Sequence, residues 1–171
     1  VLIIIPTKNG YQILKNTISS IEKTCEDVEY DIVIIDHESN DVETRQYIQK
    51  ISEKYIVMPY KGPFNFSKMN NVAVKKYSNN HNFIFFANND IEATKNGWLA
   101  RMVSLSSRPD VGAVGVALMY TDKTVQHAGV IVGMNGYADH AFRRVSVWNE
   151  DGARNVGYNS SLTVVRDFSA V

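Results

Sequence analysis

The sequence is poor in cysteine. Cys25 is the only one, so no disulfide bond can form within the chain. A lack of disulfides is typical of proteins in a reducing compartment and argues against a small secreted scaffold. Cys25 falls on the apolar side of an expected helix, which favours a packing role over that of a nucleophile. Long apolar runs are also missing, since none approaches the roughly 20 residues that span a bilayer. We therefore expect a cytoplasmic protein.

Neither sign of charge is in excess, because 18 Lys and Arg residues balance 18 Asp and Glu residues. Without a net field, the chain has no general attraction for nucleic acid or for an anionic membrane. We expect no nucleic-acid partner, and any anionic ligand must be held by local groups. The 171 residues suffice for one domain with a sizeable core, and no repeat or linker divides them. The sequence therefore predicts a single domain over residues 1–171.

Two glycine-rich phosphate-binding motifs are absent. The turn after the first apolar run, Pro6–Gly10, lacks the G-x-G-x-x-G pattern of dinucleotide-binding domains, and no P-loop pattern occurs. A nucleotidyltransferase would need a Gly- and Arg-rich signature at this same turn. A phospho-receiver domain would need an aspartate and a lysine at strand ends where neither is found. A diphosphate must then be held in another way, and a metal ion on a strand-end carboxylate is the remaining option.

Three apolar runs are present: Val1–Ile5, Ile32–Ile35 and Phe83–Ala87. Runs without polar alternation are typical of parallel strands buried on both faces, and Phe83–Ala87 is expected at the centre of the sheet. Pro6 is expected to stop the first strand because proline cannot donate to a ladder. Amphipathic helices separate the runs, the first with Leu14, Ile18, Ile21 and Cys25 on one face. This alternation predicts an α/β fold with a Rossmann-like, mostly parallel central sheet flanked by helices.

The other expected elements follow from shorter signals. Asp41 and Ser67 are expected to cap the second and third helices. A further helix is expected from Gly97 to Leu105. The remaining predictions are strands at residues 55–58, 111–120 and 162–165, a strand or a turn with a strand at 124–133, and a long loop over residues 136–159.

Acidic side chains follow two of the apolar runs, at Asp36 and at Asp90. Because parallel strands place their carboxyl ends at one edge, we expect both acids to meet in one cleft. Asp90 follows Asn88 and Asn89. One carboxylate with amide oxygens suits a hard divalent cation that carries phosphate oxygens. The alternative is that Asn88–Asp90 forms only a turn or a helix cap.

Five segments occur together in order: IIIPTKNG, IIDHESND, FNFSKMNNVAV, FFANNDIEA and GWLARMVSLSSRPDVGAVG. Together they resemble the family 2 glycosyltransferases of the GT-A fold, in particular the rhamnosyltransferase-like members that build O-antigen and other bacterial surface polysaccharides. The resemblance implies transfer of a sugar from a nucleotide-diphosphate donor to a hydroxyl of a carbohydrate or lipid-linked acceptor, with inversion and with Mg²⁺ or Mn²⁺. The alternative is a non-catalytic nucleotide-sugar or glycan-binding module on the same scaffold.

The resemblance also assigns residues. It implies that Asp36, with His37 beside it, contacts the nucleobase, that Asn88 touches the ribose, and that Asp90 binds the metal. His127 is a candidate for a second metal ligand, ahead of His140. The nucleotide-binding residues that it implies are Pro6, Thr7, Lys8, Asn9, Asp36, His37, Asn71, Asn88 and Asn89.

The chain begins inside an apolar run without methionine and ends on Ala170 and Val171. We therefore expect a piece of a longer protein, with the general base in a segment after Val171. The piece alone is then expected to bind a nucleoside diphosphate with Mg²⁺ or Mn²⁺ but to transfer little sugar. Association with the inner face of the membrane through other parts of the protein is left open.

Overall fold

The computed structural model describes residues 1–133, 136–140 and 142–146. The chain divides into two compact units, Val1–Val111 and Gly112–Val171. The expectation of a single domain over residues 1–171 stays a prediction.

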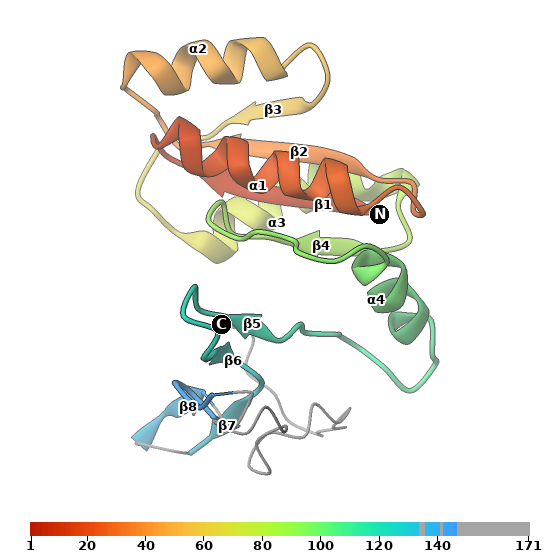
Figure 1. Cartoon of the computed structure of the whole chain (residues 1–171). Coiled ribbons are helices and arrows are strands. Elements are labelled where there is room, and N and C mark those ends of the chain that lie inside the picture. Colours follow the sequence, from red (N-terminus) through yellow and green to blue (C-terminus); the bar gives the residue numbers. More distant parts are fainter. Residues whose placement is uncertain (134–135, 141, 147–171) are drawn as a thin grey trace. The chain divides into compact units, whose positions relative to one another are not determined.

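A four-stranded parallel sheet forms the centre of the first unit, in the order β3-β2-β1-β4 (Figure 1). Its strands are β1 (Leu2–Thr7), β2 (Asp31–Asp36), β3 (Ile56–Pro59) and β4 (Ile84–Phe86). The helices between them are α1 (Tyr11–Thr24), α2 (Val42–Ile51) and α3 (Phe66–Tyr77), and α4 (Trp98–Ser106) follows β4. The prediction of a mostly parallel α/β sheet flanked by helices is confirmed.

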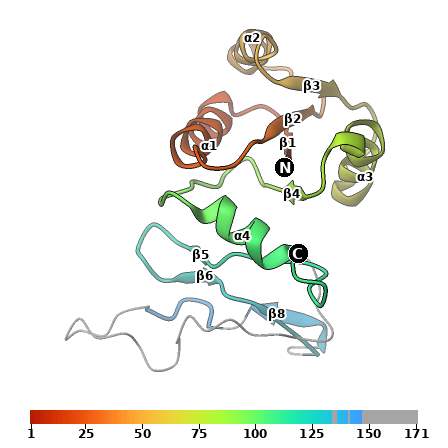
Figure 2. The same ribbon diagram turned by 90° about the vertical axis from the view of Figure 1, so that its right-hand side faces the viewer.

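Both faces of the sheet are covered, as its continuous apolar strands require (Figure 2). Side chains of alternating residues such as Ile3 and Ile5 pack with α1, where Leu14 and Ile21 are fully buried. On the other face, neighbours such as Ile4 pack with Met69 and Ala73 of α3. Cys25 is buried with the α1 cluster, and burial raises the pKa of its thiol, as suits a packing residue.

Pro6 does not stop the first strand. It lies within β1 and is paired in register with Ile35 of β2. Backbone groups of successive residues point alternately to the two neighbouring strands, so the nitrogen of Pro6 points the same way as that of Ile4, towards β4. The ladder between β1 and β4 ends at the pair Ile4–Phe86. The missing N–H of Pro6 therefore costs the sheet no hydrogen bond.

The strand expected at the centre of the sheet, β4, lies at the end of the strand order instead. It is shorter than predicted and is half-exposed, with Ile84 at 36% and Phe86 at 48% exposure. Only Phe85, between them, turns inwards, where its ring lies 5.1 Å from that of Trp98. An apolar run alone did not distinguish an edge strand from a central one.

One helix start agrees with the sequence prediction and one differs. Asp41 caps α2, accepting a hydrogen bond from the Thr44 nitrogen at 2.7 Å. At α3 the cap is Asn65, which accepts from the Lys68 nitrogen at 2.9 Å. Ser67, the residue predicted to cap, lies inside the first turn of the helix. The prediction of Ser67 as cap was wrong by two residues.

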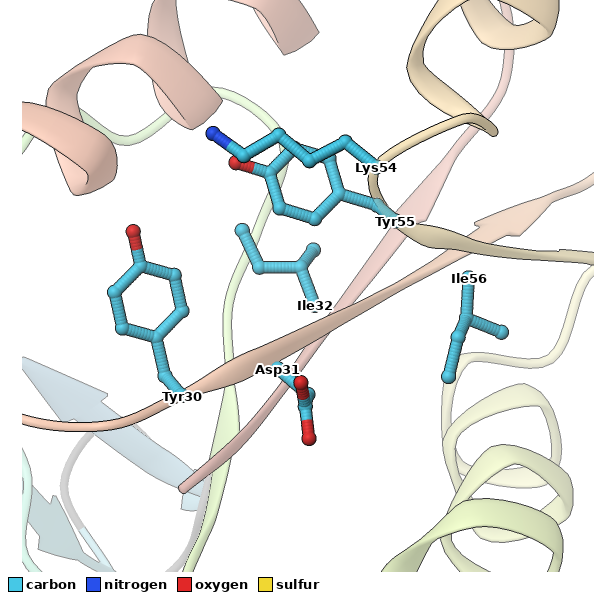
Figure 3. A pocket seen from close by; sticks show the side chains of 6 residues that line it. All are labelled: Tyr30, Asp31, Ile32, Lys54, Tyr55 and Ile56. Carbon is cyan, nitrogen blue, oxygen red and sulfur yellow. The ribbon is translucent and has the colours of Figure 1, made fainter.

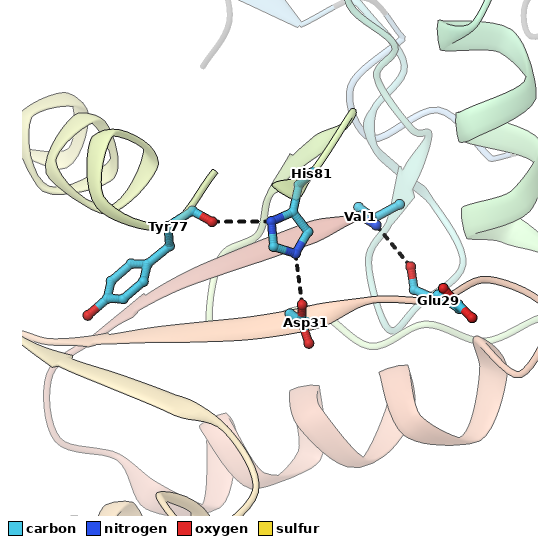
Figure 4. A network of polar contacts seen from close by, with 5 residues as sticks. All are labelled: Val1, Glu29, Asp31, Tyr77 and His81. Carbon is cyan, nitrogen blue, oxygen red and sulfur yellow. Dashed lines mark hydrogen bonds and ion pairs between the residues drawn. The ribbon is translucent and has the colours of Figure 1, made fainter. Parts of the chain in front are cut away.

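The amino ends of the strands are joined by polar contacts (Figure 4). His81 lies just before β4; its Nε2 is 2.8 Å from Oδ2 of Asp31 at the start of β2, and its Nδ1 is 3.2 Å from the Tyr77 carbonyl oxygen. The nitrogen of Val1 donates to the Glu29 carbonyl oxygen at 2.9 Å. These contacts lie at the edge of the sheet opposite to the carboxyl ends of the strands.

The second unit contains two antiparallel pairs among its described residues. β5 (Leu118–Met119) pairs with β6 (Val125–His127), and β7 (Val130–Val132) pairs with β8 (Ala138–His140). The strand predicted over residues 111–120 is thus reduced to its last part, and the strand predicted over 124–133 is divided at Gly129, whose φ is 109°.

Two further predictions for this unit concern residues that the structure describes only in part or not at all. The loop predicted over 136–159 contains β8, and its residues from 147 onwards lie outside the described residues, as does the strand predicted at 162–165. None of the helices in the described part of the chain is long and apolar enough to cross a membrane.

Candidate functional site

A pocket of about 240 Å³ opens at the carboxyl ends of β1 and β2, beside the loop that follows β4. This is the edge of a parallel sheet at which ligands bind in open α/β folds. Six of the nine residues expected to bind nucleotide lie in its wall. The lining residues are Pro6, Thr7, Lys8, His37, Phe64, Phe66, Met69, Asn88 and Asn89.

Two hydrogen bonds fix the loop after β4 to the rest of the site. Nδ2 of Asn89 donates to Oγ1 of Thr7 at 3.0 Å, and Oγ1 of Thr17 donates to the Asn89 carbonyl oxygen at 2.6 Å. Thr7 and Thr17 are both buried, so the bonds are shielded from water. Asn89 therefore positions the loop, and its neighbour Asn88 remains exposed beside the pocket.

Asn9 does not line the pocket but joins the turns after β1 and β2. Its nitrogen donates to Oγ of Ser39 at 2.9 Å, and its amide donates to Oδ1 of Asn40 at 2.9 Å. The nitrogen of Asn40 donates back to Oδ1 of Asn9 at 2.8 Å. Asn9 adopts a left-handed conformation, with φ at 58°, which asparagine tolerates better than most residues. Its role in the structure is to set the positions of these two turns.

Asp36 ends β2 and is half-buried, but it does not line the pocket. Its Oδ1 accepts a hydrogen bond from the Ser39 nitrogen at 3.1 Å. Its second oxygen has no protein donor among the described residues, so one acceptor is available to a ligand. Asn71 lies exposed on α3 and is likewise outside the pocket wall.

His37 is 5% exposed and lies in the pocket wall. Its Nε2 donates to the Gly62 carbonyl oxygen at 2.8 Å. Its ring lies 5.8 Å from that of Tyr60 and 5.9 Å from that of Phe64. The imidazole is therefore engaged by the segment before α3.

Asp90 is exposed, and its carboxylate makes no hydrogen bond or ion pair with any described residue. No group of three His, Cys, Asp or Glu side chains in the described part of the chain could enclose a metal ion. A single open carboxylate, two residues after Asn88 in the sequence, does not suit zinc, which takes a closed nitrogen and sulfur shell. It fits Mg²⁺ or Mn²⁺, which bind through one or two carboxylates and complete their shells with water and phosphate.

His127 belongs to the second unit, whereas Asp90 belongs to the first. Nδ1 of His127 lies 2.9 Å from Nδ1 of His140, with the rings nearly perpendicular. Burial, and to a smaller extent the neighbouring His140, lower the pKa of His127. The two histidines that the sequence singled out separately are thus brought together by β6 and β8.

Sequence reasoning missed the aromatic part of the site. Phe64 and Phe66 line the pocket, and both are exposed, at 70% and 38%. In the sequence, FNFS indicates only the start of a helix and part of one of the five family segments. The signal that could have found them is two phenylalanines directly after Gly62 and Pro63, where a turn places apolar side chains outside the core.

A second pocket, of about 280 Å³, lies at the amino ends of β2 and β3 (Figure 3). Lys54 and Tyr55 point to one side of the strands and Asp31 points to the other. Nζ of Lys54 is 2.6 Å from Oε1 of Glu22, and the Tyr55 hydroxyl donates to the same carboxylate. In this second pocket Lys54 and Tyr55 are already hydrogen-bonded to Glu22, and Asp31 points away from them, so these polar groups do not converge on a ligand. The pocket at the carboxyl ends of the strands is therefore the better candidate site.

The chain is similar in sequence to two known proteins. The chain is 34% identical over 146 residues to the O-antigen biosynthesis protein RfbC of Myxococcus xanthus, an alignment covering 85% of this chain and 11% of that protein. It is 32% identical over 174 residues to the uncharacterized protein y4gI of Sinorhizobium fredii, covering 100% of this chain and 18% of that one. The chain thus spans less than a fifth of the length of either relative.

A solved structure shares the fold. The mannosyltransferase PcManGT of Pyrobaculum calidifontis, in complex with GDP-Man and Mn²⁺, superposes with a TM-score of 0.55 at 18% identity, over 70% of this chain and 35% of that one. The expected GT-A fold is confirmed by this likeness. The family model for glycosyl transferase family 2 matches residues 2–162, which is nearly the whole chain. The chain therefore belongs to glycosyl transferase family 2.

Proposed function

We propose that this protein binds a nucleotide-diphosphate sugar and transfers the sugar to an acceptor hydroxyl in the synthesis of a bacterial surface polysaccharide. The observation that supports this most is the pocket at the carboxyl ends of β1 and β2, which gathers Thr7, Lys8, His37, Asn88 and Asn89. Family membership gives the reaction class, and the named role of the RfbC relative in O-antigen biosynthesis suggests the product.

In this proposal Lys8 is the only cation among the described residues that line the pocket, and its ammonium offsets the charge of the diphosphate. Thr7 and Asn89 hold the pocket in shape, and Asn88 contacts the ribose. The open oxygen of Asp36 accepts from the nucleobase, and Asn71 lies near the nucleotide. Pro6 and Asn9 shape the turn beneath it.

Asp90 would hold Mg²⁺ or Mn²⁺ through its open carboxylate. When bound, the cation would supply Lewis-acid stabilisation of the leaving diphosphate. Because this chain provides so few protein oxygens, we expect the metal to bind weakly until a diphosphate completes its coordination. The mannosyltransferase with the same fold was solved with Mn²⁺ and GDP-Man, which supports this chemistry. Inversion of the sugar is proposed as the stereochemical course.

Calorimetry with UDP, GDP and dTDP, each with and without Mn²⁺, tests the proposal directly. We expect one of the three to bind, more tightly with the metal. Asp90→Asn should abolish the effect of the metal, whereas Asp27→Asn, a change of an exposed acid after α1, should not. Absence of binding for all three nucleotides at millimolar Mn²⁺ would contradict the proposal.

A second experiment separates transfer from binding alone. Labelled sugar nucleotides should release nucleoside diphosphate in the presence of an acceptor glycan, and proton NMR of the product should show the inverted anomer. Tight binding without any turnover in the full-length protein would favour the alternative of a non-catalytic binding module. Fractionation of cells would test the proposed location in the cytoplasm at the inner face of the membrane.

A further inference from the structure

Phe64 is an unusual residue in the pocket wall. Its side chain is 70% exposed, which is the largest exposure of any phenylalanine among the described residues. It lines the pocket together with the polar turn after β1. A bare aromatic ring beside polar groups is typical of a surface that binds a planar or apolar partner. Phe66 and the buried Met69 extend the same apolar wall into the pocket.

The segment that carries Phe64 is held at both ends. The nitrogen of Tyr60 donates to the Asp36 carbonyl oxygen at 2.9 Å, and Asn65 is fixed as the cap of α3. Between them the bond from His37 to Gly62 holds the turn, where φ is 122°. Phe64 therefore has an exposed ring on a segment with little freedom, as a preorganised contact requires.

His37 connects this segment to the end of β2. It is buried, and its imidazole contacts the rings of Tyr60 and Phe64 as well as the Gly62 carbonyl oxygen. A side chain engaged in this way has little capacity left for a ligand. The contacts of His37 are those of a residue that fixes the position of Phe64 and of the turn at Gly62.

We infer that the ring of Phe64 stacks on the base of the bound nucleoside diphosphate, and that His37 is the positioning residue that holds Phe64 in place. This inference rests on the proposed function, since it needs a nucleotide in the pocket. Every base has a π-face, so stacking supplies affinity without choosing the base. The hydrogen-bonding groups at the end of β2 are left to discriminate between bases.

Binding of UDP, GDP or dTDP, whichever the wild type binds, is measured against binding of Mg²⁺ pyrophosphate, which has no base. Phe64→Ala should weaken the nucleotide by about five- to a hundredfold, the range that alanine substitution at base-stacking aromatics gives. It should leave pyrophosphate unchanged. Phe86→Ala, which removes an exposed ring of β4 outside the pocket, should change neither.

Phe64→Trp gives an independent measure. The nucleotide should quench the new fluorescence, and pyrophosphate should not. Adding His37→Ala to this variant should reduce the quenching, and His37→Gln, which retains an N–H donor, should restore part of it. A purely structural role of His37 would lower stability without this difference between nucleotide and pyrophosphate.

Three results of these binding measurements would overturn either the proposed function or the stacking of Phe64 alone. Failure of the wild type to bind any nucleoside diphosphate overturns the proposed function, and the inference with it. Wild-type binding that Phe64→Ala leaves within twofold overturns the inference alone. Equal loss of nucleotide and pyrophosphate in Phe64→Ala also overturns it, because the ring would then shape the site without contacting the base.

Discussion

Nδ2 of Asn89 donates a hydrogen bond to Oγ1 of Thr7 at 3.0 Å, across a separation of 82 residues in the sequence. This bond joins the loop after β4 to the end of β1, and both of these parts of the chain line the pocket. Its burial makes it sensitive to substitution, because a polar group that loses its partner away from water keeps the full cost of desolvation.

Thr7→Val removes the acceptor for Asn89 while keeping the shape of the side chain. We expect a loss of about 1–3 kcal/mol in the free energy of unfolding, since the Asn89 amide is left without its partner. Urea denaturation followed by circular dichroism measures this. Thr94→Val, the same change at an exposed position, is the control and should be close to neutral. Equal stability of the two variants would show that the bond contributes nothing.

Asn9 combines a left-handed conformation with hydrogen bonds to the turn after β2. Asn9→Gly loses the side-chain bonds but accepts the conformation, whereas Asn9→Ala loses the bonds and also strains the backbone. We expect both to be destabilised, Asn9→Ala by about 1 kcal/mol more than Asn9→Gly. Thermal unfolding of both variants tests the order, and a more stable alanine variant would contradict the prediction.

Asn65 and Ser67 offer a direct test of which residue caps α3. Asn65→Ala should lower the free energy of unfolding by about 1 kcal/mol, because the Lys68 nitrogen loses its acceptor. Ser67→Ala should have almost no effect, since Ser67 lies within the helix and is exposed. Chemical denaturation of the matched pair decides between them. A larger effect at Ser67 would support the prediction made from the sequence.

Tyr55 should titrate late. Burial and the hydrogen bond to Glu22 raise the pKa of its phenol to about 12. A phenol whose pKa is higher in the folded protein than in the unfolded chain stabilises the fold below pH 10, and this contribution is lost as the pH rises towards 12. The absorbance titration of the tyrosinate at 295 nm should therefore lose a late component in Tyr55→Phe. Identical titrations up to pH 12 would contradict the assignment.

Local sequence patterns predicted those parts of the fold that depend on nearby residues. Asp41 was identified as a cap because it directly precedes a segment whose Tyr47, Ile48 and Ile51 fall on one helical face. Before α3, Asn65 and Ser67 are both good caps, and the packing of Met69 and Ala73 against the sheet decided between them. Pro6 could be judged only once the neighbours of β1 were known, because the cost of a missing N–H depends on whether another strand faces it.

The candidate site was predictable to a similar degree. The turn at Pro6–Lys8 and the pair Asn88 and Asn89 line the same pocket, because carboxyl ends of parallel strands meet at one edge. Their binding of a nucleotide stays a prediction. Asp36 and Asn9 were placed at the right edge but do not line the pocket. Phe64 was missed, although its place directly after Gly62 and Pro63 indicates a turn that leaves its ring outside the core.

The amino-acid sequence by itself determined the parallel α/β architecture, the family, and the edge of the sheet at which the candidate pocket lies. These follow from apolar runs, helical periodicity and ordered motifs, which are local properties of the chain. Only the tertiary structure decided which polar groups face the pocket and which ones hold it together. In the turns after the strands, side-chain direction is set by backbone torsions such as that of Asn9 and by bonds such as that from Asn89 to Thr7, between residues that only folding brings together.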